Sequence, residues 1–358
     1  MMAKQHNAHF FKVGLADHML VNDRDKHLKK HLPLRKQPPL QSFAVSPNQQ
    51  CIGEAVAILL CTYNGEKYLS EQLDSIASQT YKNWTIYVSD DGSNDNTLQI
   101  LERYRAEIGK HRLHIFEGPK EGFAKNFLSL IKRKEIEAAY FAFSDQDDIW
   151  LKDKLERSVV QIKTFPSNTP ILYCSRTLIF SDSRKISTKS PLFKFPPSFE
   201  NSLVQSLAGG NTMMINNRSR ELLKKIDDKH KIISHDWIAY LIVSGCGGTV
   251  IYDPEPTLLY RQHEANLIGG NMGFGDRLTR LQNALKGSFI EWNDYNLLII
   301  NSLKNQLTEK NRLTLKQFEE ARHSNLLKRV FLIKSSGVYR QTVAGNISLL
   351  IATILKKI

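Results

Sequence analysis

Cysteine is scarce in this chain, and the spacing of the few cysteines excludes two kinds of stabilised fold. The 358-residue sequence contains four, Cys51, Cys61, Cys174 and Cys246, with no CxxC pair and no spacing typical of a disulfide framework. We therefore expect neither a disulfide scaffold nor a structural zinc site. This cysteine usage favours the reducing environment of the cytoplasm.

Long apolar runs are also missing. No run approaches the ~18 to 20 residues that cross a bilayer. The first residues lack the apolar core of a secretion signal. The sequence therefore predicts neither a transmembrane helix nor a cleaved signal.

Acidic residues are missing from the C-terminal end. No Asp or Glu follows Glu320, whereas lysines and arginines continue to Lys357, interleaved with apolar residues such as Leu327 and Phe331. The whole chain has a net charge of +13. A basic amphipathic C-terminus suits an anionic membrane surface, and the alternative is a solvated basic face without a partner. No motif that reads DNA or RNA accompanies the charge, so nucleic acid is not expected as a partner.

The chain divides into three parts by its pattern. Residues 1–53 are rich in His, Lys, Asn and Gln and are interrupted by prolines, which predicts a low-order N-terminal extension. Residues 54–275 alternate strand-like apolar runs with amphipathic helical runs, and residues 276–358 have a mainly helical pattern. The alternation predicts an α/β fold with a central, mostly parallel mixed sheet flanked by helices, followed by a helical C-terminal region.

The expected strands fall into a regular and an irregular set. The first set is 55–61, 84–88, 112–116 and 138–143, and the second is 171–174, 212–215, 249–252 and 257–260, with a polar loop over 182–199. No GxGxxG follows the first strand, which excludes a dinucleotide-binding fold. In parallel sheets ligands bind beyond the C-terminal ends of the strands.

Carboxylates gather at two of these strand ends. They are Asp90 and Asp91 after the second strand and Asp145, Asp147 and Asp148 after the fourth. Neighbouring carboxylates repel one another unless a cation lies among them. Oxygen ligands at an open strand end suit Mg²⁺ or Mn²⁺, completed by water and substrate phosphates. The alternative is an acidic turn that caps the helix expected from Leu151.

Lys125 and Asn126 open an expected helix directly after the loop from Gly118 to Gly122. Helix N-termini favour anions, and a lysine adds a point charge for a phosphate. The alternative is a solvated lysine without a ligand.

Several motifs occur together in a fixed order. They are Thr62-Tyr63-Asn64-Gly65, then Asp90-Asp91-Gly92-Ser93 with Asp95 and Thr97, then Asp145-Gln146-Asp147-Asp148-Ile149-Trp150. In this order and spacing they resemble family 2 glycosyltransferases. The resemblance runs from about Val56 to Ile268 and implies the nucleotide-sugar-binding GT-A fold. Further motifs look most like bacterial rhamnosyltransferases of O-antigen and capsular polysaccharide synthesis: Gly118 to Phe127, His235-Asp236-Trp237 and Tyr260-Arg261-Gln262-His263.

The resemblance implies a donor site at the ends of the first strands. Asp91, with Asp90 in support, is implied to bind the base and ribose, because a carboxylate accepts hydrogen bonds from a base N–H or a sugar hydroxyl. Other residues implied to bind the nucleotide sugar are Thr62, Tyr63, Asn64, Lys125, Asn126, Asp145 and Arg261. A helix-capping loop and ordinary turn packing are the alternatives.

The resemblance also implies a metal site. Asp147 is the implied ligand, with Asp145 directed to the ribose or to a metal-bound water. His263 is implied to complete the metal shell or to contact the diphosphate, and a structural histidine is the alternative. Asp148 is left open between the metal shell and a helix cap.

Asp236 is the residue implied to act as general base, and a helix N-cap is its alternative. Trp237 is implied to form a stacking platform for a sugar. Gly210 and Asn211 begin a strand on the acceptor side, where missing side chains leave room for a sugar. A plain tight turn explains the glycine equally.

These assignments predict an inverting, metal-dependent glycosyltransferase, since they contain one base and no second carboxylate nucleophile. The expected donor is dTDP-rhamnose, then a UDP-hexose, and the expected acceptor is a lipid-linked glycan at the inner face of the cytoplasmic membrane. One alternative is a metal-dependent nucleotidyltransferase, although a Gly-rich basic activation loop is missing after the first strand. The other is a non-catalytic nucleotide-sugar-binding subunit of a polysaccharide assembly complex.

Overall fold

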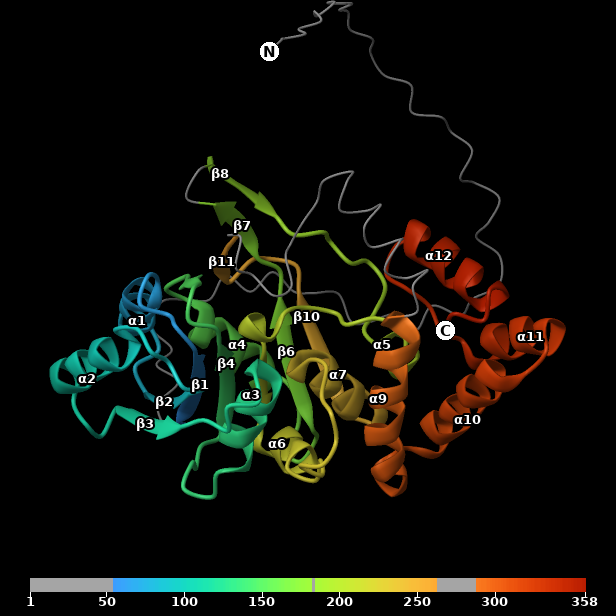
Figure 1. The fold of residues 1–358 in the computed structure, drawn as a ribbon, viewed down its shortest axis with the longest axis horizontal. Helices are drawn as coiled ribbons and strands as arrows, with labels where there is room; N and C mark the ends of the chain where they lie inside the picture. Colours follow the sequence, from blue (N-terminus) through green and yellow to red (C-terminus); the bar gives the residue numbers. More distant parts are fainter. Residues whose placement is uncertain (1–53, 182–183, 263–287) are drawn as a thin grey trace, which may run out of the picture. The chain divides into compact units, whose positions relative to one another are not determined.

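A computed structural model describes residues 54–181, 184–262 and 288–358. The expected extension over residues 1–53 and the implied metal ligand His263 lie outside the described residues. Within them the chain has the predicted α/β architecture, with a seven-stranded sheet, flanking helices and a helical C-terminus (Figure 1).

The seven-stranded sheet is mostly parallel. Its order is β10 (Thr249–Asp253), β6 (Ile171–Ser175), β9 (Met214–Asn216), β4 (Tyr140–Ser144), β1 (Val56–Thr62), β2 (Trp84–Asp90) and β3 (Leu113–Glu117). Strand β9 is antiparallel to both of its neighbours, and the other pairs are parallel. The carboxyl ends of β1, β2 and β4 therefore lie together at one edge.

Both faces of this sheet are covered, which explains the continuous apolar run of β1. Ala57, Leu59 and Cys61 pack into one core cluster, and the alternate residues pack into the other. The first cluster is closed by α3 (Phe123–Lys132), α5 (Phe199–Ser202), α6 (Asn217–Leu223) and α7 (His235–Gly245). The second is closed by α1 (Leu69–Ala77), α2 (Thr97–Ile108) and α4 (Lys154–Lys163).

A second, four-stranded sheet corrects one prediction. Its order is β5 (Ile149–Trp150), β11 (Leu258–Arg261), β7 (Leu178–Ser181) and β8 (Arg184–Lys189). Strand β8 lies where the sequence predicted a polar loop, and β7 ends just before that loop, in a stretch where no strand was predicted. Pairing of β7 with β11 and of β8 with β7 outweighs the weak strand signal of this polar stretch.

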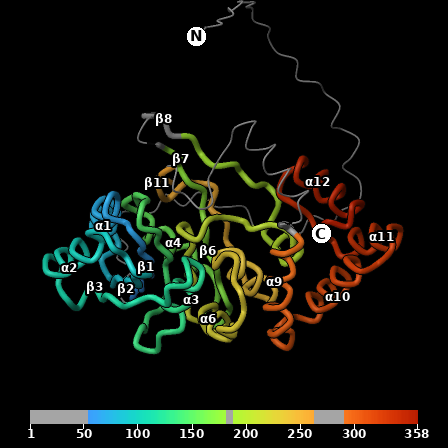
Figure 2. Tube along the Cα trace, viewed as in Figure 1, coloured from blue at the N-terminus to red at the C-terminus, as the bar shows by residue number. Residues whose placement is uncertain are grey.

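The C-terminal region is helical, as predicted. Its helices are α9 (Ser288–Ser302), α10 (Glu309–His323), α11 (Leu326–Ser336) and α12 (Val343–Ile354), and Figure 2 traces them in orange and red. The Asn311 amide at the start of α10 donates to the carbonyls of Ser244 and Gly245 at the end of α7. No helix in the described ranges has both the length and the apolarity needed to cross a membrane.

Candidate active site

The candidate site lies where β1, β2 and β4 end. Thr62 of β1 pairs in register with Asp90 of β2, and β4 on the other side of β1 runs directly into Asp145. Burial raises the pKa of the Cys61 thiol, and the charges of Asp145 and Asp91 raise it further. The two acidic clusters therefore act on one point, which is the end of β1.

Asp90 holds the strand end together. Its carboxylate accepts hydrogen bonds from the Thr62 hydroxyl (2.7 Å), the Ser93 hydroxyl (2.6 Å) and the backbone N–H groups of Gly92 and Ser93. Four donors on a buried carboxylate fix its position. The nucleotide-binding role implied for Asp90 and Thr62 stays a prediction, and the contacts observed for Asp90 are with Thr62 and with the loop after β2.

The loops after β1 and β2 are joined by side-chain hydrogen bonds. Ser93 accepts from the Asn64 N–H, and the Asn64 side chain accepts from the Asn94 N–H. The Thr97 hydroxyl accepts from the Gly65 N–H at 2.7 Å. The Asn-Gly pair and the Ser and Thr of the second motif are thus partners across 29 to 32 residues of sequence.

Asp91 fixes a third loop. One of its oxygens accepts from the Lys120 N–H at 2.7 Å, and the other accepts from the Gly122 N–H at 2.8 Å. A Cβ on Gly118 would lie 2.9 Å from the Asp91 carboxylate and 2.9 Å from the Asp90 carbonyl, so this loop needs a glycine to approach β2 so closely.

Lys125 and Asn126, which were predicted to bind the nucleotide sugar, lie in the first turn of α3 after this loop. The Lys125 ammonium donates to the Asp228 carbonyl. Asn126 is buried, and its amide donates to the Ser89 carbonyl of β2 at 2.9 Å. These contacts anchor α3 beside the site, and the ligand contacts implied for both residues stay predictions.

Sequence reasoning gave no role to Gln146. Its side-chain amide donates to the Tyr63 carbonyl and accepts from the Tyr63 N–H, each at 2.9 Å. A Cβ on Gly65 would collide with the Gln146 carboxamide, so this glycine makes room for the bridge. Tyr63 itself is 56% exposed beside it. The sequence signal for this bridge is a glutamine between acidic residues at a strand end, because its amide can both donate to and accept from the backbone of a neighbouring loop.

Burial raises the pKa of Asp145 well above its ordinary value, and the charges of Asp148, Asp147 and Asp236 raise it further. Burial and then the Asp147 charge raise the pKa of Asp148 to about 7. The carboxylate from the start of α7 therefore acts on the same site as those after β4.

Asp148 faces inward and does not cap the following helix, since the N-cap of α4 is Asp153. One Asp148 oxygen accepts from the Asn211 amide at 2.5 Å, and the other accepts from the Arg261 N–H at 3.4 Å. Asp145 and Asp147 are the other carboxylates of this loop, and the metal-binding role implied for them stays a prediction.

The described residues supply only part of the ligand set of a divalent cation. Within the described ranges, no three His, Cys, Asp or Glu side chains converge as a metal cluster. Mg²⁺ bound to nucleotides, however, commonly takes one or two carboxylates and completes its shell with phosphates and water. The mutual repulsion around Asp145 is the observation that a cation would relieve.

Lys154 was also missed by sequence reasoning. It is 1% exposed, and its ammonium donates to the Asn211 carbonyl at 2.9 Å. Burial lowers its pKa to about 7, although the charge of Asp148 opposes this shift. A lysine in the first turn of an amphipathic helix gives no sign that it points into the core.

Arg261 of β11 is buried and bound within the protein. Its guanidinium pairs with Glu71 at 2.5 Å and donates to the Asp147 carbonyl at 3.1 Å. The arginine therefore positions the backbone of the predicted metal-binding residue. Its implied phosphate contact stays a prediction.

Asp236 lies in the first turn of α7, and Ser234 is the N-cap of that helix. The Asp236 carboxylate accepts from the Ser234 hydroxyl and from the Trp237 N–H. Burial raises its pKa, and these bonds with one from the Gly210 backbone limit the rise. The alternative of Asp236 as the N-cap is thus wrong, because the serine two residues earlier occupies that position.

His235 fills the space beside Gly210. Its ring stacks on Phe127 with 3.9 Å between centroids and meets Phe143 edge-on at 5.2 Å. A Cβ on Gly210 would collide with the His235 ring, so this glycine makes room for an imidazole. Burial lowers the His235 pKa to about 3, which keeps the ring neutral.

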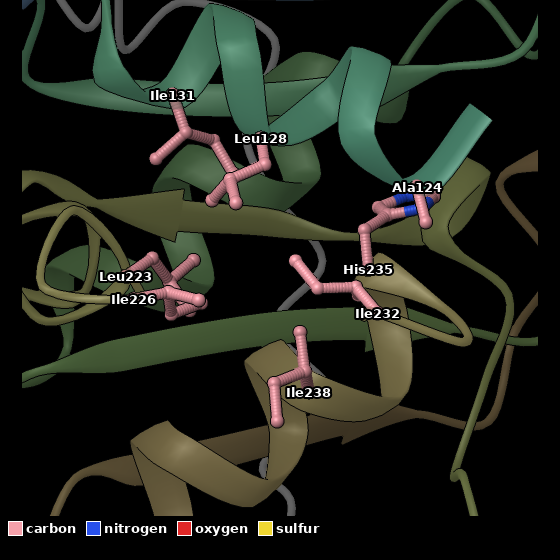
Figure 3. Close-up of a pocket in the computed structure, with 8 residues that line it drawn as sticks. All are labelled: Ala124, Leu128, Ile131, Leu223, Ile226, Ile232, His235 and Ile238. Atoms are coloured by element: carbon pink, nitrogen blue, oxygen red, sulfur yellow. The ribbon is translucent and has the colours of Figure 1, made fainter. Parts of the chain in front are cut away.

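Apolar side chains continue this environment behind the ring. Figure 3 shows His235 beside Ala124 at one end of a cavity whose other walls are aliphatic. Leu128 and Ile131 come from α3, and Ile238 comes from α7. The start of α7, and with it Asp236, is therefore held by packing against α3.

Trp237 is buried, and its indole donates to the Ser202 carbonyl at 2.7 Å. Its ring meets Trp292 edge-on, with 6.4 Å between centroids. These are the contacts of a packing residue, and the platform role implied for Trp237 stays a prediction, as do the acceptor-side roles of Gly210 and Asn211.

Comparisons with known proteins identify the family of this chain. The model of glycosyl transferase family 2 matches residues 57–231. The dTDP-rhamnosyl transferase RfbG of Shigella flexneri is 34% identical over 235 residues, which is 62% of this chain and 78% of the relative.

Two solved structures are similar in fold. The S. aureus TarS structure with UDP-GlcNAc has a TM-score of 0.49 at 15% identity and covers 84% of this chain and 90% of its own. The mannosyltransferase PcManGT of Pyrobaculum calidifontis, solved with GDP-Man and Mn²⁺, has a TM-score of 0.48 at 14% identity and covers 87% of each chain. On the family match and the identity to RfbG, this chain belongs to glycosyl transferase family 2.

Proposed function

We propose that this protein is an inverting, metal-dependent glycosyltransferase that moves a sugar from a nucleotide donor to a glycan acceptor. What supports this most is that carboxylates from two separate elements act on one group: burial raises the pKa of Asp145 well above its ordinary value, and the charges of Asp148, Asp147 and Asp236 raise it further. An in-line displacement needs charge neutralisation at the leaving diphosphate and a base at the attacking hydroxyl. Two carboxylate groups from separate elements, acting on one site, meet that need.

Asp236 is the proposed base, and it takes the proton of the acceptor hydroxyl. Its raised pKa makes the carboxylate more basic than an ordinary aspartate, and its bonds to Ser234 and Trp237 hold it in place. General base catalysis of this kind contributes about 10² to 10⁴-fold. Gly210, which bonds to this carboxylate through its backbone, and Asn211 lie on the proposed acceptor side with Trp237.

The proposed donor site lies mainly at the carboxyl ends of β1 and β2. Asp91 and Tyr63 contact the base and ribose, with Thr62, Asn64, Asp90 and Asn126 as the surrounding residues. Lys125 and Arg261 are directed to the diphosphate. Asp147 with Asp145, and His263 outside the described residues, would hold Mg²⁺ or Mn²⁺, which would supply Lewis-acid neutralisation of the leaving diphosphate.

The donor and acceptor follow from chemistry and from the relatives. The name of RfbG supports dTDP-rhamnose as the first donor to test, followed by a UDP-hexose. The proposed acceptor is a lipid-linked glycan of surface polysaccharide or O-antigen synthesis. Such an acceptor is held in a bilayer, so we place the enzyme peripherally at the inner face of the cytoplasmic membrane.

Donor turnover across a nucleotide-sugar panel, with Mg²⁺ or Mn²⁺ and with or without chelator, tests the proposal. We expect release of a nucleoside diphosphate that stops with chelator, and we expect Asp147→Asn and Asp236→Asn each to abolish transfer while the protein stays folded. Asp227→Asn, at an exposed position on the loop after α6, is the matched control.

Other outcomes would contradict separate parts of the proposal. Release of pyrophosphate would identify a nucleotidyltransferase, and donor binding without turnover would identify a binding subunit. Turnover that survives chelator would contradict the metal requirement. Near-normal transfer by Asp236→Asn would contradict the role of Asp236 as the base. A product of retained anomeric configuration would contradict the inverting mechanism.

A further inference from the structure

Helix α12 presents an apolar stripe to solvent. The exposed residues are Val343, Ile347, Leu350, Ile351 and Ile354. Their spacing places them on one face of the helix, and Val343 at its start is 76% exposed. The sequence of α12, VAGNISLLIATI, contains no charged residue. Aliphatic side chains in such number are seldom left in water without a partner.

Helix α11, which packs against α12, also exposes apolar side chains. Leu327 and Phe331, one turn apart, are exposed, Leu327 by 85%. The two helices pack together, because the buried Arg329 of α11 donates to the carbonyls of Thr353 (3.0 Å) and Ile354 (3.3 Å) at the end of α12. We call these exposed residues of the two helices, Leu327, Phe331, Val343, Ile347, Leu350, Ile351 and Ile354, the α11–α12 face.

The charged residues of the sequence that follows Glu320 have one sign. No Asp or Glu follows Glu320, and that carboxylate already pairs with Lys328 at 2.6 Å. Lys334 near the end of α11 and Lys356 after α12 are exposed. The apolar face is therefore bordered by cations without nearby acidic residues in the sequence.

We infer that the α11–α12 face docks this protein on an anionic lipid bilayer, with α12 lying in the plane of the interface. Twelve residues of α-helix are about 18 Å long, well short of the ~30 Å hydrocarbon core, which suits a helix that lies in the interface. Apolar side chains enter the headgroup region, and the lysines contact anionic headgroups. The inference names the membrane contact for the proposed function and rests on its membrane location.

Charge argues for lipid over a second copy of this chain. Two copies joined through this face would bring two sets of lysines together, and like charges across an interface oppose association. An anionic bilayer attracts the same lysines. The occupant that satisfies both the apolar stripe and the positive border is therefore a lipid surface.

Cosedimentation of the full-length protein with vesicles tests the inference. We expect binding to phosphatidylglycerol–phosphatidylethanolamine vesicles that weakens with salt and is poor with phosphatidylcholine alone. Ile347→Gln with Ile351→Gln should weaken partitioning about tenfold or more, equivalent to about 1.4 kcal/mol. The matched control is Leu98→Gln on α2, because Leu98 and Ile351 have the same exposure of 43%.

Three results would overturn the inference. The first is no binding to anionic vesicles by the unmodified chain. The second is equal binding by the control and by the Ile347 and Ile351 variant. The third is a dimer in light scattering that this variant dissociates, which would assign the face to self-association.

Vesicle binding needs no sugar transfer, so its failure is distinguishable from failure of the proposed reaction. We expect the variant at Ile347 and Ile351 to keep donor turnover at the unmodified rate in detergent.

Discussion

Replacing Lys154 by methionine should destabilise the protein through the acidic loop. The lysine is buried, donates to the Asn211 carbonyl at 2.9 Å, and is the cation that acts on Asp148 beneath the site. Methionine has a similar length and no charge. The substitution therefore fills the space while it removes the hydrogen bond and the positive charge.

The structure sets the size of the effect. Leaving the Asn211 carbonyl without its buried donor costs about 1 to 3 kcal/mol. Asp148 also loses a positive charge that lowers its pKa, and its pKa of about 7 lets it become protonated and limit that loss. We therefore expect the upper end of that range, about 3 kcal/mol in the free energy of unfolding at pH 7.

The effect should grow with pH. The pKa of Lys154 is lowered from 10.5 to about 7 by burial, so between these values the unfolded chain binds the proton and the folded chain does not. Stability of the unmodified protein from this group then rises with pH across that window, by up to about 1.4 kcal/mol per pH unit. The variant lacks this contribution, and its deficit is larger at pH 9 than at pH 7.

Urea unfolding followed by tryptophan fluorescence at pH 7 and pH 9 measures both effects. Lys152→Met is the matched control, because Lys152 is exposed only two residues away. Adding Asp148→Asn to Lys154→Met removes both charges and should recover at least half of the deficit. A Lys154→Met protein within about 0.5 kcal/mol of the unmodified one, below the range given for an unsatisfied buried group, or a double variant that recovers nothing, would refute the reasoning.

Three further predictions concern the strand ends. Gly210→Ala should cost about 1 to 3 kcal/mol in thermal unfolding, because its methyl group must displace the His235 ring; an unchanged midpoint would contradict this. Gly65→Ala should expel the Gln146 side chain, lower donor affinity in a binding titration, and leave the fold intact; unchanged affinity would remove the bridge from the donor site. The acid limb of the pH profile of kcat/KM should lie above the ordinary aspartate pKa, since the pKa of Asp236 is raised and activity falls as pH drops through it; a limb at or below that value would exclude this base.

The fold was largely predictable because its main signal is local. Strands β1, β2 and β4 are short apolar runs buried on both faces, and such runs between amphipathic helices indicate a parallel sheet. Strands β7 and β8 were missed because β7 pairs with the distant β11, Leu178 opposite Leu259, and β8 in turn pairs with β7. Neither the four-residue run of β7 nor the polar composition of β8 indicates these partners.

The acidic residues of the site could be located from the sequence, but their individual tasks could not. Asp90, Asp91 and Asp148 look alike in a motif, yet Asp90 binds the loop after its own strand and Asp91 binds the loop after β3. Asp148 turns inward to Asn211, 63 residues away. Which carboxylate faces a ligand depends on where distant backbone donors lie, and spacing carries no record of that.

Gly210 is a further residue whose surroundings the sequence could not reveal. A missing side chain at Gly210 looked like room for a sugar, and the structure fills that room with His235. The imidazole is neutral and packed against Phe127, so it supports the first turn of α7 mechanically and carries no charge to Asp236. A protonated histidine beside the base would lower the basicity of its carboxylate, whereas a neutral ring leaves burial as the main influence on its pKa. The glycine therefore serves the proposed chemistry by admitting the side chain that keeps the base rigid and basic.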